Sequence, residues 1–116
     1  MNEKKHNSTV LETCLAKPAV LEQLIDYTDD SVVSKTIIDK PVGTITLFAF
    51  DERQGLSEHT APYDAVVQVL DGRALLTIGG KQTAVSAGEL IIMPANIPHT
   101  VASDGKFKML LTMIRA

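Results

Sequence analysis

Residues 88–99 decide the fold, and they read Gly88-Glu89-Leu90-Ile91-Ile92-Met93-Pro94-Ala95-Asn96-Ile97-Pro98-His99. The apolar run 90–93 has the length of a short buried strand, and Pro94 ends it because proline cannot donate to a strand ladder. Asn96 suits a tight turn, since asparagine tolerates a positive φ better than most residues with a side chain. The pattern predicts that the chain reverses here and that His99 begins the next strand pointing inward. A histidine directly after a rigid turn is held firmly, as a ligand or acid–base group must be.

Short strand-like runs separated by turn residues extend outward from this segment. The runs expected to be strands are 32–33, 37–38, 44–50, 66–70, 74–78, 82–85, 90–93 and the alternating stretch 107–113. Gly79-Gly80 reads as a two-residue hairpin turn, and Asp71-Gly72 as a turn that ends the strand 66–70. Many short strands between glycine turns predict an antiparallel sandwich or barrel. Several runs are apolar on both faces and therefore need cover on both sides.

The N-terminal part differs in pattern from the rest of the chain. Residues 1–30 are expected to form an arm, and residues 31–116 a single barrel domain. Residues 1–17 are mostly polar and predict a loosely docked segment. After Pro18, apolar residues recur at helical spacing, which predicts one or two helical turns.

The composition bounds the function. The 116 residues are enough for one domain, and the net charge of −3 provides no basic stripe, which excludes nucleic acid as a partner. No apolar run approaches the roughly 18–20 residues of a membrane span, so no membrane partner is expected. The single cysteine, Cys14, cannot form a disulfide within the chain and fits the reducing cytoplasm.

The segment 88–99 resembles the second conserved motif of the cupins. Gly88, Pro94 and His99 lie at the family spacing, Asn96 replaces a usual glycine, and Ser103 stands where asparagine is common. The resemblance covers residues 40–114 and implies an all-β, antiparallel cupin barrel (a double-stranded β-helix, or jelly roll) with at most a short N-terminal helix. The sequence of residues 57–65 is similar to that of small, single-domain cupins of the type-2 conserved barrel group with no settled activity.

The first cupin motif is recognisable here mainly through the spacing of its positions. When positions are counted back from Gly72, His59 stands at the first histidine of the motif. Ala61 and Ala65 stand where the family has its second histidine and its glutamate, and Arg53 replaces the leading glycine, although Gly55 is close by. The resemblance therefore implies an incomplete metal-ligand set that keeps His59 and His99.

Two histidines are too few for a tight site, because catalytic metal centres normally take three protein ligands. We expect His59 and His99 to hold at most a weakly bound divalent metal, with Zn, Ni, Mn and Fe as the candidates. Asp64 or Glu58 would have to complete the site. An ideal strand turns Asp64 away from the pocket, and its alternative role is to cap a backbone amide in a turn. Tyr63 is expected either to line the pocket mouth or to pack.

Three functions stay open at this point. The first is a small-molecule binding cupin with a weak or absent metal site, and we favour it because two ligands are lost. The second is a metal-dependent dioxygenase, isomerase or cyclase acting on a small organic acid or sugar, and the third is a metal-free acid–base enzyme that uses His59 and His99. The sequence decides neither the ligand nor whether the protein is an enzyme. We also expect a homodimer, formed by packing of sheet faces or by exchange of N-terminal strands.

Overall fold

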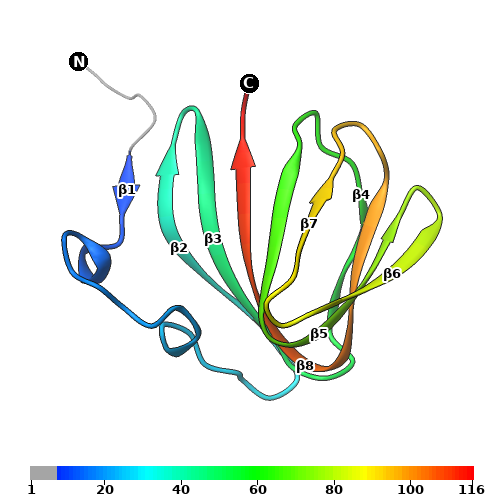
Figure 1. The fold of residues 1–116 in the computed structure, drawn as a ribbon, viewed down its shortest axis with the longest axis horizontal. Coiled ribbons are helices and arrows are strands. Elements are labelled where there is room, and N and C mark those ends of the chain that lie inside the picture. Colours follow the sequence, from blue (N-terminus) through cyan, green and yellow to red (C-terminus); the bar gives the residue numbers. More distant parts are fainter. Residues whose placement is uncertain (1–7) are drawn as a thin grey trace.

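The computed structural model describes residues 8–116 and is almost entirely antiparallel β-structure (Figure 1). Its strands are β1 Thr9–Val10, β2 Val32–Lys40, β3 Gly43–Phe50, β4 Gly55–His59, β5 Ala65–Ile78, β6 Lys81–Ser86, β7 Leu90–Met93 and β8 His99–Ile114. The helices are two single 3-10 turns, η1 Glu12–Cys14 and η2 Leu21–Gln23. The predicted all-β fold with at most a short N-terminal helix is confirmed. Within residues 8–116, no helix has the length and apolar character needed to cross a membrane.

The strands form one curved sheet in the order β1-β2-β3-β8-β5-β6, with β4 added to β8 and β7 added to β5. The long strands β5 and β8 bend, so each contributes to two layers (Figure 1). The first half of β5 pairs with β7 and with the end of β8, whereas its second half pairs with β6 and with the start of β8. The two bends wrap the sheet around a common interior.

The turn predicted at Asp71-Gly72 is wrong. β5 continues through these two residues without a break, and its pairing with β8 shifts register on both sides of them. Gly72 has a φ of 73°, and a Cβ atom at this position would overlap the carbonyl oxygen of Lys106. The glycine therefore makes an irregularity that bends a continuous strand, which is the other structure that an isolated glycine in a strand indicates. The hairpin predicted at Gly79-Gly80 is confirmed, with both residues at positive φ between β5 and β6.

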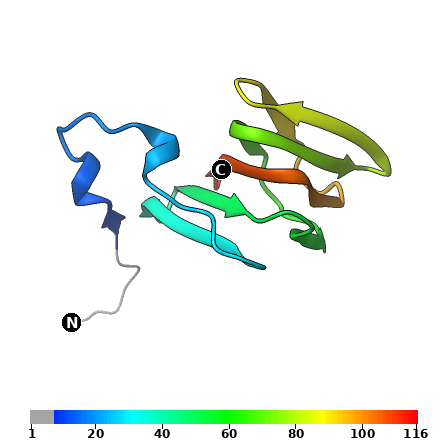
Figure 2. The ribbon, with the colours of Figure 1, turned by 90° about the horizontal axis from the view of Figure 1, so that it is seen from below.

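The interior of the barrel is packed with apolar side chains from opposite sides of the sheet. Its buried members are Phe50, Ala65, Val67, Val69, Ala74, Leu76, Val85, Met93, Val101, Phe107 and Met109. The rings of Phe50 and Phe107 stack with centroids 4.3 Å apart. A second cluster lies on the outer face, where Ile25, Leu24 and Tyr27 cover Leu47 and Ala49. The N-terminal segment thus lies over one face of the sheet, as Figure 2 shows from below.

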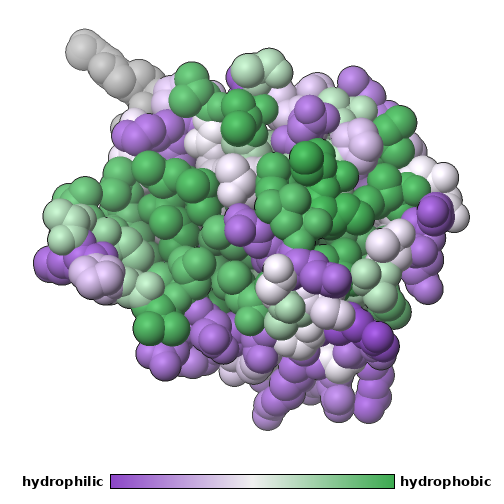
Figure 3. All heavy atoms as spheres, in the orientation of Figure 1, coloured by the Kyte–Doolittle hydropathy of each residue, from purple (hydrophilic) through white to green (hydrophobic). Residues whose placement is uncertain are grey.

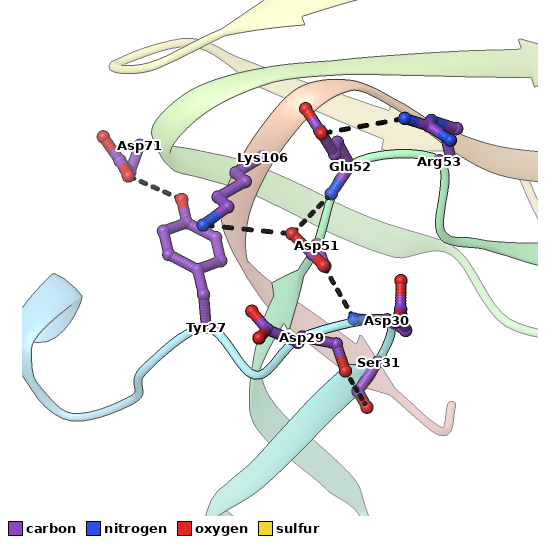
Figure 4. Close-up of polar contacts among 9 residues, drawn as sticks. All are labelled: Tyr27, Asp29, Asp30, Ser31, Asp51, Glu52, Arg53, Asp71 and Lys106. Carbon is purple, nitrogen blue, oxygen red and sulfur yellow. Dashed lines mark hydrogen bonds and ion pairs between the residues drawn. The ribbon is translucent and has the colours of Figure 1, made fainter.

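The bends of β5 and β8 meet the N-terminal segment at a polar cluster that we call the closed end. It consists of Tyr27, Asp51, Asp71 and Lys106, which Figure 4 shows, together with Lys108. The hydroxyl of Tyr27 donates to Asp71 over 2.5 Å. The Nζ atoms of Lys106 and Lys108 lie 5.4 Å and 5.0 Å from the centroid of the Tyr27 ring. Asp51 accepts backbone N–H groups from Asp30 and Glu52 at 2.7 Å and 2.9 Å. Burial, followed by the hydrogen bond to Asp71, raises the pKa of Tyr27 above its ordinary value.

Candidate functional site

The predicted histidine pair meets at the opposite end of the barrel, which we call the mouth: His59, His99 and the loops 60–64 and 94–98. β4 pairs with the start of β8 so that His59 lies directly opposite His99. Their Nε2 atoms are 2.9 Å apart, although the residues are forty positions apart in the sequence. The ring planes meet edge to face at 74°. His99 is 3% exposed, whereas His59 is exposed at the rim.

The two loops of the mouth are held together by hydrogen bonds that backbone N–H groups of the loop 94–98 donate to the loop 60–64. The N–H of Ala95 donates to Oδ1 of Asp64 at 2.8 Å, and the N–H of Asn96 donates to the carbonyl oxygen of Ala61 at 2.7 Å. Asn96 has a φ of 65°, as expected from the asparagine that replaces the family glycine. Asp64 therefore fixes the turn that presents His99, in the capping role that the sequence offered as the alternative to metal binding.

The remaining nitrogen of each ring faces a backbone carbonyl. Nδ1 of His59 lies 2.9 Å from the oxygen of Ser57, and Nδ1 of His99 lies 3.2 Å from the oxygen of Ile97. A carbonyl oxygen can only accept, so each Nδ1 is placed to donate to its carbonyl, and a ring that is protonated at Nδ1 alone presents the Nε2 lone pair. Both carbonyls belong to the residue two positions before the histidine. The sequence could not reveal these contacts, because they depend on backbone orientation.

The distance of 2.9 Å between the two Nε2 atoms is that of a hydrogen bond, in which an Nε2–H of one ring donates to the Nε2 lone pair of the other. When neither Nε2 carries a proton, the two lone pairs face each other and can share a cation instead. Burial holds the pKa of His99 below its ordinary value of 6.5, and the charge of His59 acts in the same direction. The hydrogen bond to Ile97 opposes this shift. Burial thus favours the uncharged ring of His99, in which an Nε2 without a proton can accept one or bind a metal ion. A backbone carbonyl on Nδ1 is also the usual partner of a metal-binding histidine.

The other candidate residues do not add a third donor to this pair. Within residues 8–116, no cluster of three His, Cys, Asp or Glu side chains could hold a metal ion. Ala65 is 2% exposed and packs in the apolar interior, opposite Met93 on β7. Glu58 lies on β4 and is exposed. Tyr63 is half-buried in the loop 60–64, and its role as a ligand-binding residue stays a prediction.

Arg53 stands at the position where the first cupin motif has its leading glycine. Its φ is 65°, which is the left-handed conformation that glycine adopts without strain. Arg53 therefore adopts the kind of backbone conformation for which a glycine is preferred. Asn96 does the same in the second motif. Both positions have a left-handed backbone, whereas Ala61 and Ala65 supply no donor atoms.

Comparisons with known proteins agree with this architecture. The family model described as "Cupin domain" matches residues 46–115. A conserved Streptococcus pyogenes protein of unknown function is 35% identical over 87% of this chain and 89% of that chain, with a TM-score of 0.84. A cupin superfamily protein from Desulfitobacterium hafniense is 26% identical over 87% and 93%, with a TM-score of 0.83. A cupin 2 conserved barrel domain protein from Leptotrichia buccalis is 39% identical over 80% of this chain but 45% of its own, with a TM-score of 0.78.

A search of curated proteins found no significant match. The family model nevertheless covers more than half of the chain, and the S. pyogenes structure exceeds 30% identity over most of its length. The observed barrel, the two motif frames and these matches lead to the same result: the chain belongs to the cupin family.

Proposed function

We propose that this cupin binds a small organic molecule at the mouth of its barrel, together with a weakly held divalent cation. The observation that carries the proposal is the pair of Nε2 atoms of His59 and His99, 2.9 Å apart, with both Nδ1 atoms facing carbonyl oxygens. This arrangement orients two imidazole lone pairs toward one point. Zinc, nickel, manganese and iron all accept imidazole ligands.

The donor set fits a divalent ion only in part. Two protein ligands hold a metal less tightly than three or four, because each missing ligand removes a bond. The remaining coordination positions would be filled by water or by the oxygen atoms of a bound molecule. A small organic acid suits this site, since its carboxylate supplies the anionic oxygen that Ala65 cannot. Tyr63 is the residue of the loop 60–64 that we expect to contact this molecule.

Binding without catalysis is the function that these residues support best. The metal-dependent enzyme stays as a second hypothesis, and the same histidine pair is its basis. The similar structures reported above do not separate the binding protein from the enzyme, because they are a protein of unknown function and two proteins named only as cupins. We place the protein in the cytoplasm, because its single cysteine suits a reducing compartment.

Calorimetric titration with Zn²⁺ and Ni²⁺ tests the metal part of the proposal. We expect micromolar or weaker affinity for the unmodified protein and no measurable binding by His59→Ala or His99→Ala. His6→Ala is the matched control, because it removes the third histidine of the chain and leaves both His59 and His99 in place. Binding that survives in both mouth variants would place the metal elsewhere.

The ligand part is tested by thermal denaturation with a panel of small carboxylic acids and sugars, with and without Zn²⁺. We expect a member of the panel to raise the melting temperature of the unmodified protein and to leave that of His99→Ala unchanged. Equal shifts in both proteins would show that the molecule binds away from the mouth.

A further inference from the structure

Four strands carry a row of side chains across the inner face of the sheet, the face that lines the barrel. The register pairs its members across β4, β8, β5 and β6, and they are His59, His99, Ile78 and Lys81. Residues paired across neighbouring strands point to the same side of a sheet. Val101 and Leu76, two positions further along β8 and β5, are buried in the apolar interior. Because successive side chains alternate along a strand, the row faces the interior as well.

The row ends in a lysine that the fold leaves available. Lys81 is the first residue of β6, directly after the hairpin turn, and it is exposed. Within residues 8–116, its ammonium makes no hydrogen bond or ion pair, whereas those of Lys35 and Lys108 are bound to carbonyl oxygens. The loops 60–64 and 94–98 contain no lysine or arginine. Lys81 is therefore the side chain of the row that can attract an anion to the mouth.

The acidic side chains of the mouth are not placed to neutralise Lys81. Asp64 accepts the N–H of Ala95, and Glu58 lies on β4, which β8 and β5 separate from β6. Two strand spacings put the backbones of β8 and β6 about 10 Å apart. The half-buried Ile78 lies between them and packs against the interior. The row thus has the histidine pair at one end, a free ammonium at the other and an apolar side chain in the middle.

We propose that Lys81 binds a carboxylate of the molecule that occupies the mouth, and that this molecule is a short dicarboxylic acid. One carboxylate meets the histidine pair or the cation that it holds, the middle of the molecule lies over Ile78, and the second carboxylate meets Lys81. An ammonium and a carboxylate form a charge-assisted hydrogen bond, and the flexible lysine stem lets the ammonium adjust to the length of the ligand. The inference rests on the function proposed above and adds the class of ligand and a residue that selects it.

A groove on the outer face is a less suitable place for this ligand. It has a volume of about 260 Å³ and an almost wholly apolar lining, to which Ile38, Ile45 and Ile114 contribute. Figure 3 shows broad apolar areas on the face that carries η1, η2 and β7. Among the described residues of the lining, Lys40 alone is basic. A dicarboxylate in this groove would find one cation, whereas the mouth offers a binding group for each end.

Calorimetric titration at a fixed concentration of Zn²⁺ tests the proposal. Succinate, glutarate and adipate are each compared with the monocarboxylate of the same number of carbon atoms, namely butanoate, pentanoate and hexanoate. We expect the unmodified protein to bind the best dicarboxylate about five-fold more tightly than its partner. This preference equals about 1 kcal/mol, the upper range for an exposed ion pair, and it should decrease at high ionic strength.

Three variants assign the preference to a residue. Lys81→Met should bind the two acids of a pair within about two-fold of each other, and Lys81→Arg, which retains the charge, should retain the preference. Lys40→Met is the matched control, since it removes the same charge from the outer groove and should leave the preference unchanged. Far-ultraviolet circular dichroism checks that each variant is folded.

The possible failures separate this inference from the function on which it rests. A preference that persists in Lys81→Met, or that is lost in Lys40→Met, would overturn the role of Lys81. Equal binding of both acids by the unmodified protein would also overturn it. If that equal binding is abolished in His99→Ala, the function proposed above stands without Lys81. An unmodified protein that binds none of the six acids would contradict both proposals.

Discussion

The two ends of the barrel use polar side chains for opposite purposes. At the closed end, Tyr27, Asp51 and Lys106 join segments that are distant in the sequence. At the mouth, the Nε2 atoms of His59 and His99 meet 2.9 Å apart. Polar groups whose hydrogen bonds are made within the protein stabilise the fold, while groups whose capacity is left over are available for a ligand.

Two lysines illustrate how polar groups with hydrogen bonds inside the protein stabilise the fold. Nζ of Lys108, which is 9% exposed, donates to the carbonyl oxygen of Glu22 at 2.5 Å, and Nζ of Lys35 donates to that of Leu24 at 3.1 Å. These carbonyls belong to η2 and the residue that follows it, where backbone acceptors lack partners within the turn. Two cations from the sheet thus hold the N-terminal segment. The comparison predicts that changes at the closed end alter stability, and that changes at the mouth alter binding.

The largest effect on stability is expected from Phe107→Ala. Phe107 is fully buried and stacks on Phe50 at 4.3 Å, so its removal leaves a cavity where β8 bends. We expect a loss of about 3–5 kcal/mol in the free energy of unfolding, measured by urea denaturation. His59→Ala at the exposed rim is the control and should change it by less than about 1 kcal/mol. Similar losses in both variants would contradict the expectation that the rim of the mouth contributes little to the free energy of unfolding.

The next largest effect is expected at the mouth, from restoring the family ligands by Ala61→His with Ala65→Glu. Two added donors should raise the affinity for Zn²⁺ or Ni²⁺ by about 100-fold or more, equivalent to about 2.7 kcal/mol. Without metal the double variant should unfold at a lower temperature, because Ala65 lies in the apolar interior and an unpaired carboxylate there is costly. Added metal should reverse that loss, since it binds only the folded state.

Calorimetry and thermal denaturation with and without metal check both effects, and Ala61→Gln with Ala65→Gln serves as the control of similar size. Nanomolar binding by the unmodified protein would show that its site is already complete. In that case Asp64 would have to leave Ala95, or Glu58 would have to reach the pair.

The sequence predicted the elements whose signals are local. Pro94 ends β7, Asn96 adopts a positive φ, and Gly79-Gly80 closes a hairpin, because each depends on the conformational preference of the residue itself. The sequence predicted that His59 and His99 meet, because the spacing of the two cupin motifs fixes the register of the two strands that hold them. Their meeting at 2.9 Å follows from that register.

The errors came from features that depend on partners far along the chain. Asp71-Gly72 has the composition of a turn, yet β5 continues through it because β8 pairs with it on both sides. β4 is mostly exposed and has no apolar alternation, so only its pairing with β8 identifies it as a strand. The contact of Tyr27 with Asp71 spans 44 positions and leaves no local pattern. In these stretches, the local sequence does not indicate which distant residue each residue contacts.

Acid should affect the two ends in different ranges of pH, and the closed end responds at the lower one. The N–H of Asp30, followed by that of Glu52, holds the pKa of Asp51 below its ordinary 3.8 against the opposing effect of burial. The folded chain thus binds this proton less readily than the unfolded chain. The stabilisation is complete above pH 3.8 and is lost as the pH falls through 3.8 toward the folded pKa. Asp51→Asn should be less stable than the unmodified protein at pH 7, and the difference should shrink on acidification.

The smallest expected effect is that of His99, and it appears closer to neutrality. Burial lowers the pKa of His99 below 6.5, so the unfolded chain takes up this proton first as the pH falls. Stability is therefore unaffected above pH 6.5 and decreases as the pH falls through 6.5 toward the folded pKa. Urea denaturation at several pH values, with a chelator present to exclude metal, should show this decrease in the unmodified protein and in Asp51→Asn but not in His99→Gln. The hydrogen bond to Ile97 limits the decrease, because it favours the charged ring. A decrease that persists unchanged in His99→Gln would show that the titrating group lies outside the mouth, and the neutral lone pair on which the proposed cation binding depends would lose its support.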